Sequence, residues 1–250
     1  MKSWTTILAG ALCGAMLAVA IIFAAASHGL LPRNTGSTDI RTYLLSHPEL
    51  LSQMNDLLQA RQQAETDRAN AAMLKKVGMA AFFDPKLAFV TGPANARNSL
   101  VEFYDYDCPY CRASLPAVIR FYEAHKGDTR FSFIELPIPQ LHGPSAVLAA
   151  RASLAARRQP DKYVPFHFVL MSEKGVVDED AIFADARKVG MNVAKLKADM
   201  QSPEIDKVIA RSRALALKAG IDGTPTFIAN GVMHPGVVDD QALRDMARTG

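Results

Sequence analysis

The sequence contains few cysteines and little net charge, and each of these features argues against one class of protein. Only three cysteines occur among its 250 residues, and Cys13 lies within an apolar run near the N-terminus. An exported protein built around disulfides carries more cysteines and spreads them along the chain. The net charge is +3, and no run of five like charges occurs, so nucleic acid is not an expected partner. Cys108 and Cys111 are therefore expected to carry chemistry.

Residues 7–26 form an uncharged apolar run that follows Lys2. As a helix this run would span about 30 Å, the thickness of a bilayer core. The small residues 24–26 would suit a signal-cleavage site. The run therefore predicts either a retained membrane anchor or a cleaved signal, and both alternatives export the rest of the chain.

The composition divides the chain into three segments. Residues 1–33 comprise the signal or anchor and a linker. Residues 34–81 are helical in pattern, with leucines at 44, 51 and 58 recurring at a spacing of seven. One interpretation makes 39–76 a stalk that holds a homo-oligomer together, and the other docks it on its own domain.

Two helices are expected within the second segment. Thr38 or Asp39 caps a short helix that runs through Leu45. Ser46 and Glu49 have the spacing of a capping box, which predicts that a longer helix begins there.

Residues 82–250 predict an α/β core with a helical insertion. A strand, a helix and a strand are followed by a block of helices, and Asn230-Gly231 then indicates a hairpin turn. The expected strands are 87–90, 100–104, 130–136, 226–229 and 232–238. The expected helices are 116–125, 145–158, 166–172, 179–189, 193–200, 203–219 and 239–247.

The motif Cys108-Pro109-Tyr110-Cys111 lies where the expected strand 100–104 gives way to a helix. Free N–H groups and the dipole at a helix N-terminus favour a thiolate at the first cysteine. Thiolate is the species that attacks a disulfide, and the second cysteine can resolve the mixed disulfide. Pro109 suits the first helical turn. We expect Cys108 to be the exposed nucleophile and Cys111 the buried resolving thiol.

Two other interpretations of the cysteine pair are weaker. A zinc site needs two more ligands, and the histidines at 125, 142 and 167 show no ligand spacing. A purely structural disulfide closing so short a loop would add only about 2 kcal/mol. Redox chemistry is therefore the preferred interpretation, with no metal and no cofactor beyond the disulfide itself.

The stretch from Val101 to Cys111 (VEFYDYDCPYC) resembles the active-site strand of DsbA-like proteins in the thioredoxin superfamily. Residues 223–227 (GTPTF) resemble the second signature of that family, a cis-proline loop opposite the cysteines. The resemblance covers about 82–248. The helices at 39–76 look like those of the branch that contains the suppressor-of-copper-sensitivity protein C.

The resemblance implies a thioredoxin-like fold and assigns further residues to the site. Glu102, six positions before Cys108, matches a buried acidic residue that assists proton transfer from the second cysteine. From the residues alone, Glu102 could be such a base or could face solvent. Pro225 would be cis after Thr224, where the residues alone suggest only the start of a strand.

The expected function is an exported protein thiol–disulfide oxidoreductase, either an oxidase or an isomerase, that forms, isomerises or reduces disulfides. Its partners would be exported client proteins with cysteines and a membrane electron-transfer partner. We expect it in the bacterial periplasm, tethered by residues 7–26 or soluble after cleavage. Tyr110 replaces the histidine of strongly oxidising members, which shifts the expectation toward isomerase or reductase. The alternative is an envelope copper-handling protein that binds Cu(I) through the CxxC pair.

Overall fold

The computed structural model describes residues 36–248, with side chains from Asp39 onward. The signal or anchor expected at 7–26 lies outside the described residues. Within the described range, no helix is both long enough and apolar enough to cross a bilayer. The chain divides into two compact units, one ending at Gln62 and the other beginning at Gln63.

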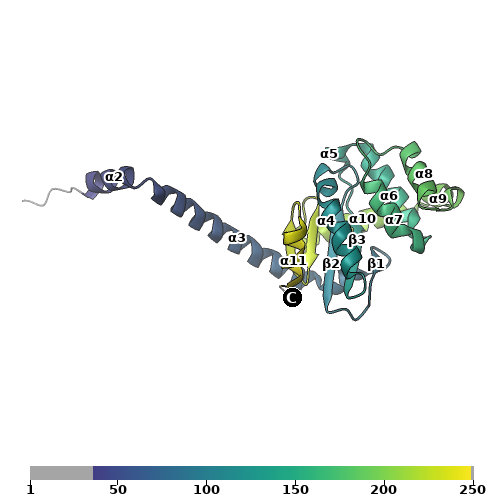
Figure 1. Ribbon diagram of the computed structural model, residues 1–250, viewed down its shortest axis with the longest axis horizontal. Helices are drawn as coiled ribbons and strands as arrows, with labels where there is room; N and C mark the ends of the chain where they lie inside the picture. Colours follow the sequence, from purple (N-terminus) through teal and green to yellow (C-terminus); the bar gives the residue numbers. More distant parts are fainter. Residues whose placement is uncertain (1–35, 249–250) are drawn as a thin grey trace, which may run out of the picture. The chain divides into compact units, whose positions relative to one another are not determined.

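Five strands form one sheet in the order β1-β3-β2-β4-β5 (Figure 1). Strands β2 and β3 are parallel, and the other three pairs are antiparallel. A parallel pair requires a crossover, which is helix α4, Pro109–His125. The strands are β1 (Phe89–Thr91), β2 (Asn98–Tyr104), β3 (Thr129–Glu135), β4 (Thr226–Ala229) and β5 (Val232–Pro235).

The hairpin between β4 and β5 is the one expected from Asn230-Gly231. Both residues have positive φ, 50° and 86°, as a two-residue hairpin turn of this type requires. Strand β1 begins later than expected. Leu87 and Ala88 are buried but donate to the Asp84 carbonyl in a turn, so they precede the strand.

The helices between β3 and β4 form the expected insertion, and α11 closes the fold. One short helix, α5, was not expected. The set comprises α5 (Pro139–His142), α6 (Pro144–Ala156), α7 (Pro160–Met171), α8 (Glu179–Lys188), α9 (Val193–Met200), α10 (Glu204–Ala219) and α11 (Asp240–Arg248). The α/β core with a helical insertion is therefore confirmed.

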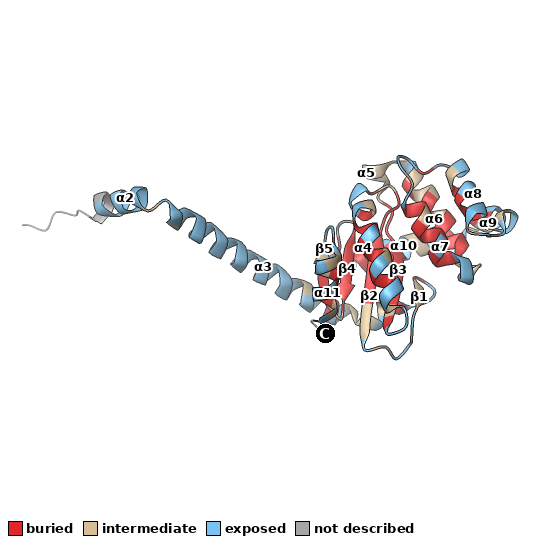
Figure 2. Cartoon of the chain, in the orientation of Figure 1, coloured by how far each residue is buried: buried red, intermediate tan, exposed pale blue. Residues whose placement is uncertain are grey.

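Alternate strand residues face opposite sides of the sheet, and each side has its own buried cluster. On the side that we call the α4 face, Leu100 and Phe133 pack with α4, the insertion and α11. On the α10 face, Val101 and Ile134 pack with α10 and the short helix η1, Met79–Phe83. Figure 2 shows the central strands largely in red, the colour of buried residues.

The N-terminal helices differ from the expectation at two points. They are α2 (Gly36–Ser46) and α3 (Glu49–Val77). Because α2 already begins at Gly36, Thr38 and Asp39 lie inside its first turn, and the expectation that one of them caps this helix is wrong. The capping box at Ser46 is wrong, because the Ser46 hydroxyl donates to the Tyr43 carbonyl, 2.9 Å away. It therefore lies at the end of α2 and does not cap α3.

The last turns of α3 dock on the domain that follows. Leu74 is 3% exposed and belongs to the cluster on the α10 face. Met73 lies so close to Gly220 that a Cβ there would come within 2.5 Å of its methyl group. Gly220 ends α10 with a φ of 75°, so glycine satisfies both the backbone and the packing. Of the two alternatives for residues 39–76, docking on the domain of the same chain is therefore confirmed for the last turns of α3.

Candidate active site

The two cysteines lie at the start of α4, directly after the central strand β2. Cys108 is the N-cap residue and Pro109 takes the first helical position. The Cys108 amide donates to the Asp105 carbonyl at 3.1 Å, which closes the turn between strand and helix. Both cysteines are free thiols in the structure. The strand-to-helix junction therefore lies where the sequence predicts it.

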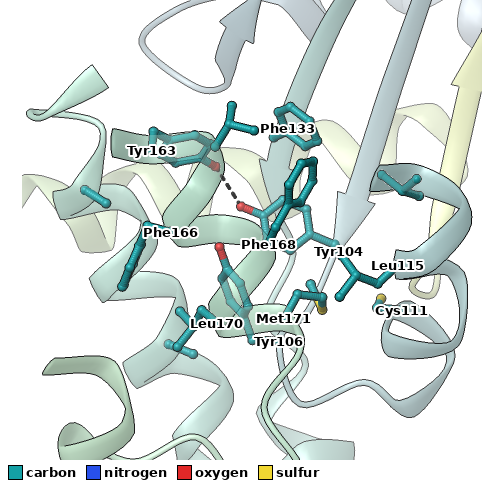
Figure 3. Close-up of a cluster of buried hydrophobic side chains, with 14 of the residues drawn as sticks. Tyr104, Tyr106, Cys111, Leu115, Phe133, Tyr163, Phe166, Phe168, Leu170 and Met171 are labelled. Atoms are coloured by element: carbon teal, nitrogen blue, oxygen red, sulfur yellow. Dashed lines mark hydrogen bonds between the residues drawn. The ribbon is translucent and has the colours of Figure 1, made fainter. Parts of the chain in front are cut away.

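The expected exposure of Cys108 is wrong. Cys108 is 2% exposed and Cys111 is 1% exposed. The exposed member of the motif is Tyr110, at 63%. Cys111 belongs to the buried cluster on the α4 face, with Leu115 and Met171 (Figure 3).

The surroundings of Cys108 favour its thiolate. Hydrogen bonding from the Cys111 thiol is the largest influence and lowers the pKa of Cys108. Burial opposes this, but Thr224 and the backbone groups of Cys111 and Tyr110 lower the pKa further, to about 5 from 9.0. At neutral pH the reduced form therefore carries a thiolate at Cys108, the species that attacks a disulfide.

The surroundings of Cys111 have the opposite effect. Burial raises the pKa of Cys111 well above 9.0, and the hydrogen bond and charge of Cys108 raise it further. A backbone hydrogen bond from Asp105 lowers it, and the charge that Glu102 carries when it is ionised raises it. The pair thus holds one proton, on Cys111.

Glu102 lies inside the protein on the α4 face and does not face solvent. It is 4% exposed and stands in β2 between Phe133 of β3 and Phe227 of β4. Burial raises its pKa from 4.5 to about 8, and its Oε2 is buried without a hydrogen-bond partner. Near neutral pH, Glu102 therefore holds a proton that it can exchange with a neighbouring group.

The loop before β4 lies against Cys108. Because β4 pairs with β2 at Thr226 and Phe103, the preceding residues reach the start of α4. The Thr224–Pro225 peptide bond is cis, the geometry implied by the family resemblance. When protonated, the Cys108 thiol donates to the Thr224 carbonyl at 3.2 Å. The buried Thr224 hydroxyl has no other hydrogen-bond partner and is the group of this residue that lowers the pKa of Cys108.

Sequence reasoning missed the acidic residues of the turn before Cys108. The Asp107 carboxylate accepts from the Arg112 guanidinium at 3.0 Å and from the Val177 amide at 3.1 Å. The Asp105 carboxylate accepts from the Ile138 amide, and it also pairs with His142. Aspartates in a strand-to-helix turn are a recognisable signal. The sequence gives no such signal for their partners in the insertion, because these partners lie 33 to 70 residues away along the chain.

The site is a dithiol with a buried acid and a cis-proline loop. Among residues 39–248, no group of three or more His, Cys, Asp or Glu side chains could hold a metal ion. The arrangement can exchange the Cys108–Cys111 disulfide with a disulfide or dithiol brought to Cys108.

Comparison with known proteins gives a family match over residues 99–247, to the DSBA-like thioredoxin domain. A thioredoxin-like oxidoreductase from Silicibacter pomeroyi has a similar structure, with 39% identity and a TM-score of 0.61, covering 68% of this chain and 96% of that one. The catalytic domain of Proteus mirabilis ScsC has 26% identity and a TM-score of 0.61, covering 71% and 96%.

Curated relatives match over shorter shares of their length. Disulfide bond formation protein D of Bacillus subtilis is 26% identical over 170 residues, which cover 62% of this chain and 73% of that protein. The first relatives are Na⁺/H⁺ antiporters named NhaA. The one from Herminiimonas arsenicoxydans is 32% identical over 161 residues, 64% of this chain, but the match spans only 25% of its own length.

Proposed function

Since the chain belongs to the DSBA-like thioredoxin domain family, we propose that it is a protein thiol–disulfide oxidoreductase that acts through Cys108 and Cys111. One observation carries the proposal. The two neighbouring thiols have opposite pKa shifts, to about 5 at Cys108 and well above 9.0 at Cys111. Such a pair separates an attacking and leaving sulfur from a sulfur that keeps its proton.

The exchange runs in two steps. A client thiolate attacks the Cys108 sulfur of the oxidised protein, the Cys108–Cys111 bond breaks, and Cys111 leaves with the electron pair. Glu102, which is protonated below a pKa of about 8, supplies the proton that Cys111 retains. A second client thiolate then attacks the client sulfur of the mixed disulfide, and Cys108 leaves as a thiolate. Two electrons pass from the client to the protein.

The acidity of Cys108 favours disulfide donation. A stabilised thiolate stabilises the reduced protein, and this makes its disulfide the stronger oxidant. Hydrogen bonds supply this effect although Tyr110 stands where a cationic residue would add to it. We therefore favour an oxidase or isomerase, with a membrane electron-transfer partner restoring the disulfide.

Export to the periplasm is part of the proposal. The apolar run at 7–26 is long enough for a membrane anchor and also suits a signal. Clients would then be exported proteins with cysteines, either near the inner membrane or free in the periplasm.

We further propose that copies of the chain associate through α2 and the first half of α3. Apolar side chains on these helices are unusually exposed, and a helix with an unburied apolar stripe is marginal in water. The exposed set comprises Ile40, Tyr43, Leu44, Leu45, Leu51, Met54, Leu57 and Leu58. A second copy carries the same stripe at the same seven-residue spacing, so it is the occupant that we favour.

Light scattering tests the association on residues 34–250 and on residues 63–250. We expect an oligomer that becomes a monomer when the exposed stripe is removed. A monomer in both cases would exclude the association and leave the redox function untouched.

Insulin reduction and refolding of scrambled ribonuclease test the redox function. We expect activity in both, and mixed disulfides that accumulate in Cys111→Ala but not in Cys108→Ala. Equal trapping by the two variants would reverse the assigned roles. Absence of exchange in the wild type would refute the function.

A further inference from the structure

A groove on the α4 face lies at the opposite end of α4 from the cysteines. Its volume is about 490 Å³, and it is lined by residues of the edge strand β1, the end of α4 and helix α7. Tyr122, in its wall, stands 14 positions after Cys108, which is about 20 Å along a helix. The groove is therefore separate from the redox site.

The wall of the groove is aromatic, and ring contacts hold it in place. Phe89 stacks on Tyr163 with ring centroids 3.8 Å apart, and Tyr122 meets Phe168 edge to face at 5.6 Å. Val164 adds an aliphatic side chain to the same wall. Because these rings pack against the core, an apolar side chain that enters the groove meets a surface that is already formed.

The rim of the groove is a strand with one free edge. Strand β1 stands at the end of the sheet and pairs with β3 alone. In the described part of the chain, residues 89–91 make no other backbone–backbone hydrogen bond. Phe89 and Thr91 line the groove, while Val90 packs on the α10 face, as alternation along a strand requires. A free edge of this kind can pair with an extended chain.

The charged groups of the groove leave one carboxylate without a cation. Glu123 and Lys126 at the end of α4 pair with each other. Asp161, in the first turn of α7, is exposed and forms no salt bridge within the described residues. The three groups together carry a net charge of −1. A ligand that complements this groove therefore combines an apolar group with a positive charge.

We propose that this groove binds an extended segment of a client polypeptide, with an aromatic side chain against Phe89 and Phe168 and a basic side chain beside Asp161. The inference rests on the proposed function, because it gives the clients of that function a second contact with the protein. The bound segment adds a strand to β1, and its alternate side chains face the groove. The aromatic side chain supplies most of the affinity, and Asp161 supplies the preference for a basic neighbour.

The distance from the groove to Cys108 determines which clients benefit. An extended chain rises about 3.3 Å per residue, so at least about six residues must separate the bound segment from a cysteine that reacts at Cys108. A client held in the groove with a spacer of this length has a raised local concentration of its cysteine at the redox site. Clients that are unfolded over this length therefore gain most.

The first test is fluorescence anisotropy of a fluorescein-labelled, cysteine-free peptide, Thr-Val-Phe-Thr-Arg-Val, titrated with the full chain. Its Phe and Arg stand two positions apart, so both face the same side of an extended chain. Two comparison peptides replace Phe by Ala or Arg by Gln.

Two variants of the protein probe the groove. Asp161→Asn removes the charge, and Thr91→Tyr fills the groove with a larger side chain that suits a strand. The matched control is Asp180→Asn, because Asp180 is also exposed in the first turn of a helix, that of α8, but does not line the groove.

The peptide with Ala in place of Phe should bind about thirtyfold more weakly, as loss of a buried aromatic ring predicts. Asp161→Asn should weaken binding of the Arg peptide about fivefold, as loss of one exposed ion pair predicts, and should leave binding of the Gln peptide unchanged. Thr91→Tyr should weaken binding of all three peptides. Asp180→Asn should bind them as the wild type does.

The second test measures the first exchange step, in which a peptide thiolate attacks the Cys108 sulfur and Cys111 leaves. The peptides carry one cysteine, placed three or ten residues from the same segment on either side. We expect the ten-residue spacer to react about tenfold faster than the three-residue spacer on the side that faces Cys108. This advantage should shrink in Thr91→Tyr.

Equal binding of the Phe and Ala peptides, or equal effects of Asp161→Asn and Asp180→Asn, would overturn the inference alone. If Thr91→Tyr fails to fold, the peptide series and Asp161→Asn still decide. A second copy of the chain is the competing occupant. An oligomer that Asp161→Asn dissociates in light scattering, with no peptide bound by the wild type, would also overturn the inference. Peptide binding without any disulfide exchange would overturn the proposed function, and the client interpretation with it.

Discussion

Two buried glutamates on the same face of the same sheet differ in almost every contact. Glu102 is 4% exposed and Glu135 is 1% exposed. Glu102 has no partner for its Oε2. Glu135 accepts from Tyr104 at 2.9 Å and from Ser153 at 2.8 Å, and it pairs with Arg157. Both glutamates are therefore buried. They differ because hydrogen bonds and a cation compensate for the burial of the Glu135 carboxylate, whereas Oε2 of Glu102 has no partner.

The region around Glu135 is an extended polar network, although Nε2 of His167 and Nε of Arg157 are buried without a hydrogen-bond partner. His167 contacts the Tyr106 hydroxyl at 2.9 Å, Tyr106 donates to Ser153 at 2.9 Å, and Ser153 donates to Glu135. The Tyr163 hydroxyl lies 2.9 Å from that of Tyr104 (Figure 3). The hydrogen bonds of this network connect the sheet to the helices of the insertion. The comparison teaches that a paired buried carboxylate holds structure, whereas an unpaired one is available for proton transfer.

Removal of the partner of Glu135 should have the largest effect. Arg157→Met leaves the carboxylate buried without its cation, which should cost about 3–5 kcal/mol of unfolding free energy. Urea unfolding measures this loss of unfolding free energy, and the dependence of that free energy on urea concentration should be the same in the variant and the wild type. The neighbouring Arg158→Met is the control, because Arg158 is 48% exposed in its pair with Asp199 and should cost at most about 1 kcal/mol. Equal losses in both variants would contradict the compensation argument.

Glu102→Gln should change the pH dependence of stability. The folded pKa of about 8 lies above the ordinary 4.5, so the unfolded chain releases its proton first as the pH rises. Stability is therefore lost between about pH 4.5 and pH 8, by about 3 kcal/mol at pH 7. The variant should lack this loss relative to the wild type, yet release Cys111 about 100-fold more slowly. A difference in stability that does not vary with pH would exclude the raised pKa.

In the reduced protein, Cys108 should make stability rise with pH, which is the opposite of the effect of Glu102. Its folded pKa of about 5 lies below 9.0, so the thiolate adds stability that is complete above pH 9 and is lost as the pH falls to 5. At pH 7 the unfolding free energy of the reduced wild type should exceed that of reduced Cys108→Ser by roughly 2–3 kcal/mol. Denaturant unfolding from pH 5 to pH 9 checks this, and a constant difference would contradict it.

Loss of one hydroxyl from the network should have the smallest effect. Tyr106→Phe leaves His167 without its partner and should cost about 1–2 kcal/mol. Tyr110→Phe, at a ring that is 63% exposed, should leave stability unchanged. Thermal unfolding distinguishes the two variants, and similar shifts would show that the network adds nothing.

The features that could be predicted from the sequence are those determined by residues close together along the chain. The Cys-Pro-Tyr-Cys motif at a strand-to-helix junction and the Asn230-Gly231 turn depend on neighbouring residues, and both lie where expected. Ser46 failed as a cap because its hydroxyl satisfies the end of the preceding helix instead. The partners of Glu135 were not predictable, because Arg157 and Ser153 reach it only when the insertion folds back on the sheet.

The near-complete burial of Cys108 also bears on how the protein responds to oxidants. A thiolate is the form that peroxide attacks, but oxidation also requires access, and Cys108 as a residue is 2% exposed. A sulfenic acid formed there would meet Cys111 one turn away and condense to the disulfide, releasing water. Oxidative damage is thereby diverted into the working oxidised state before irreversible sulfinic acid can form.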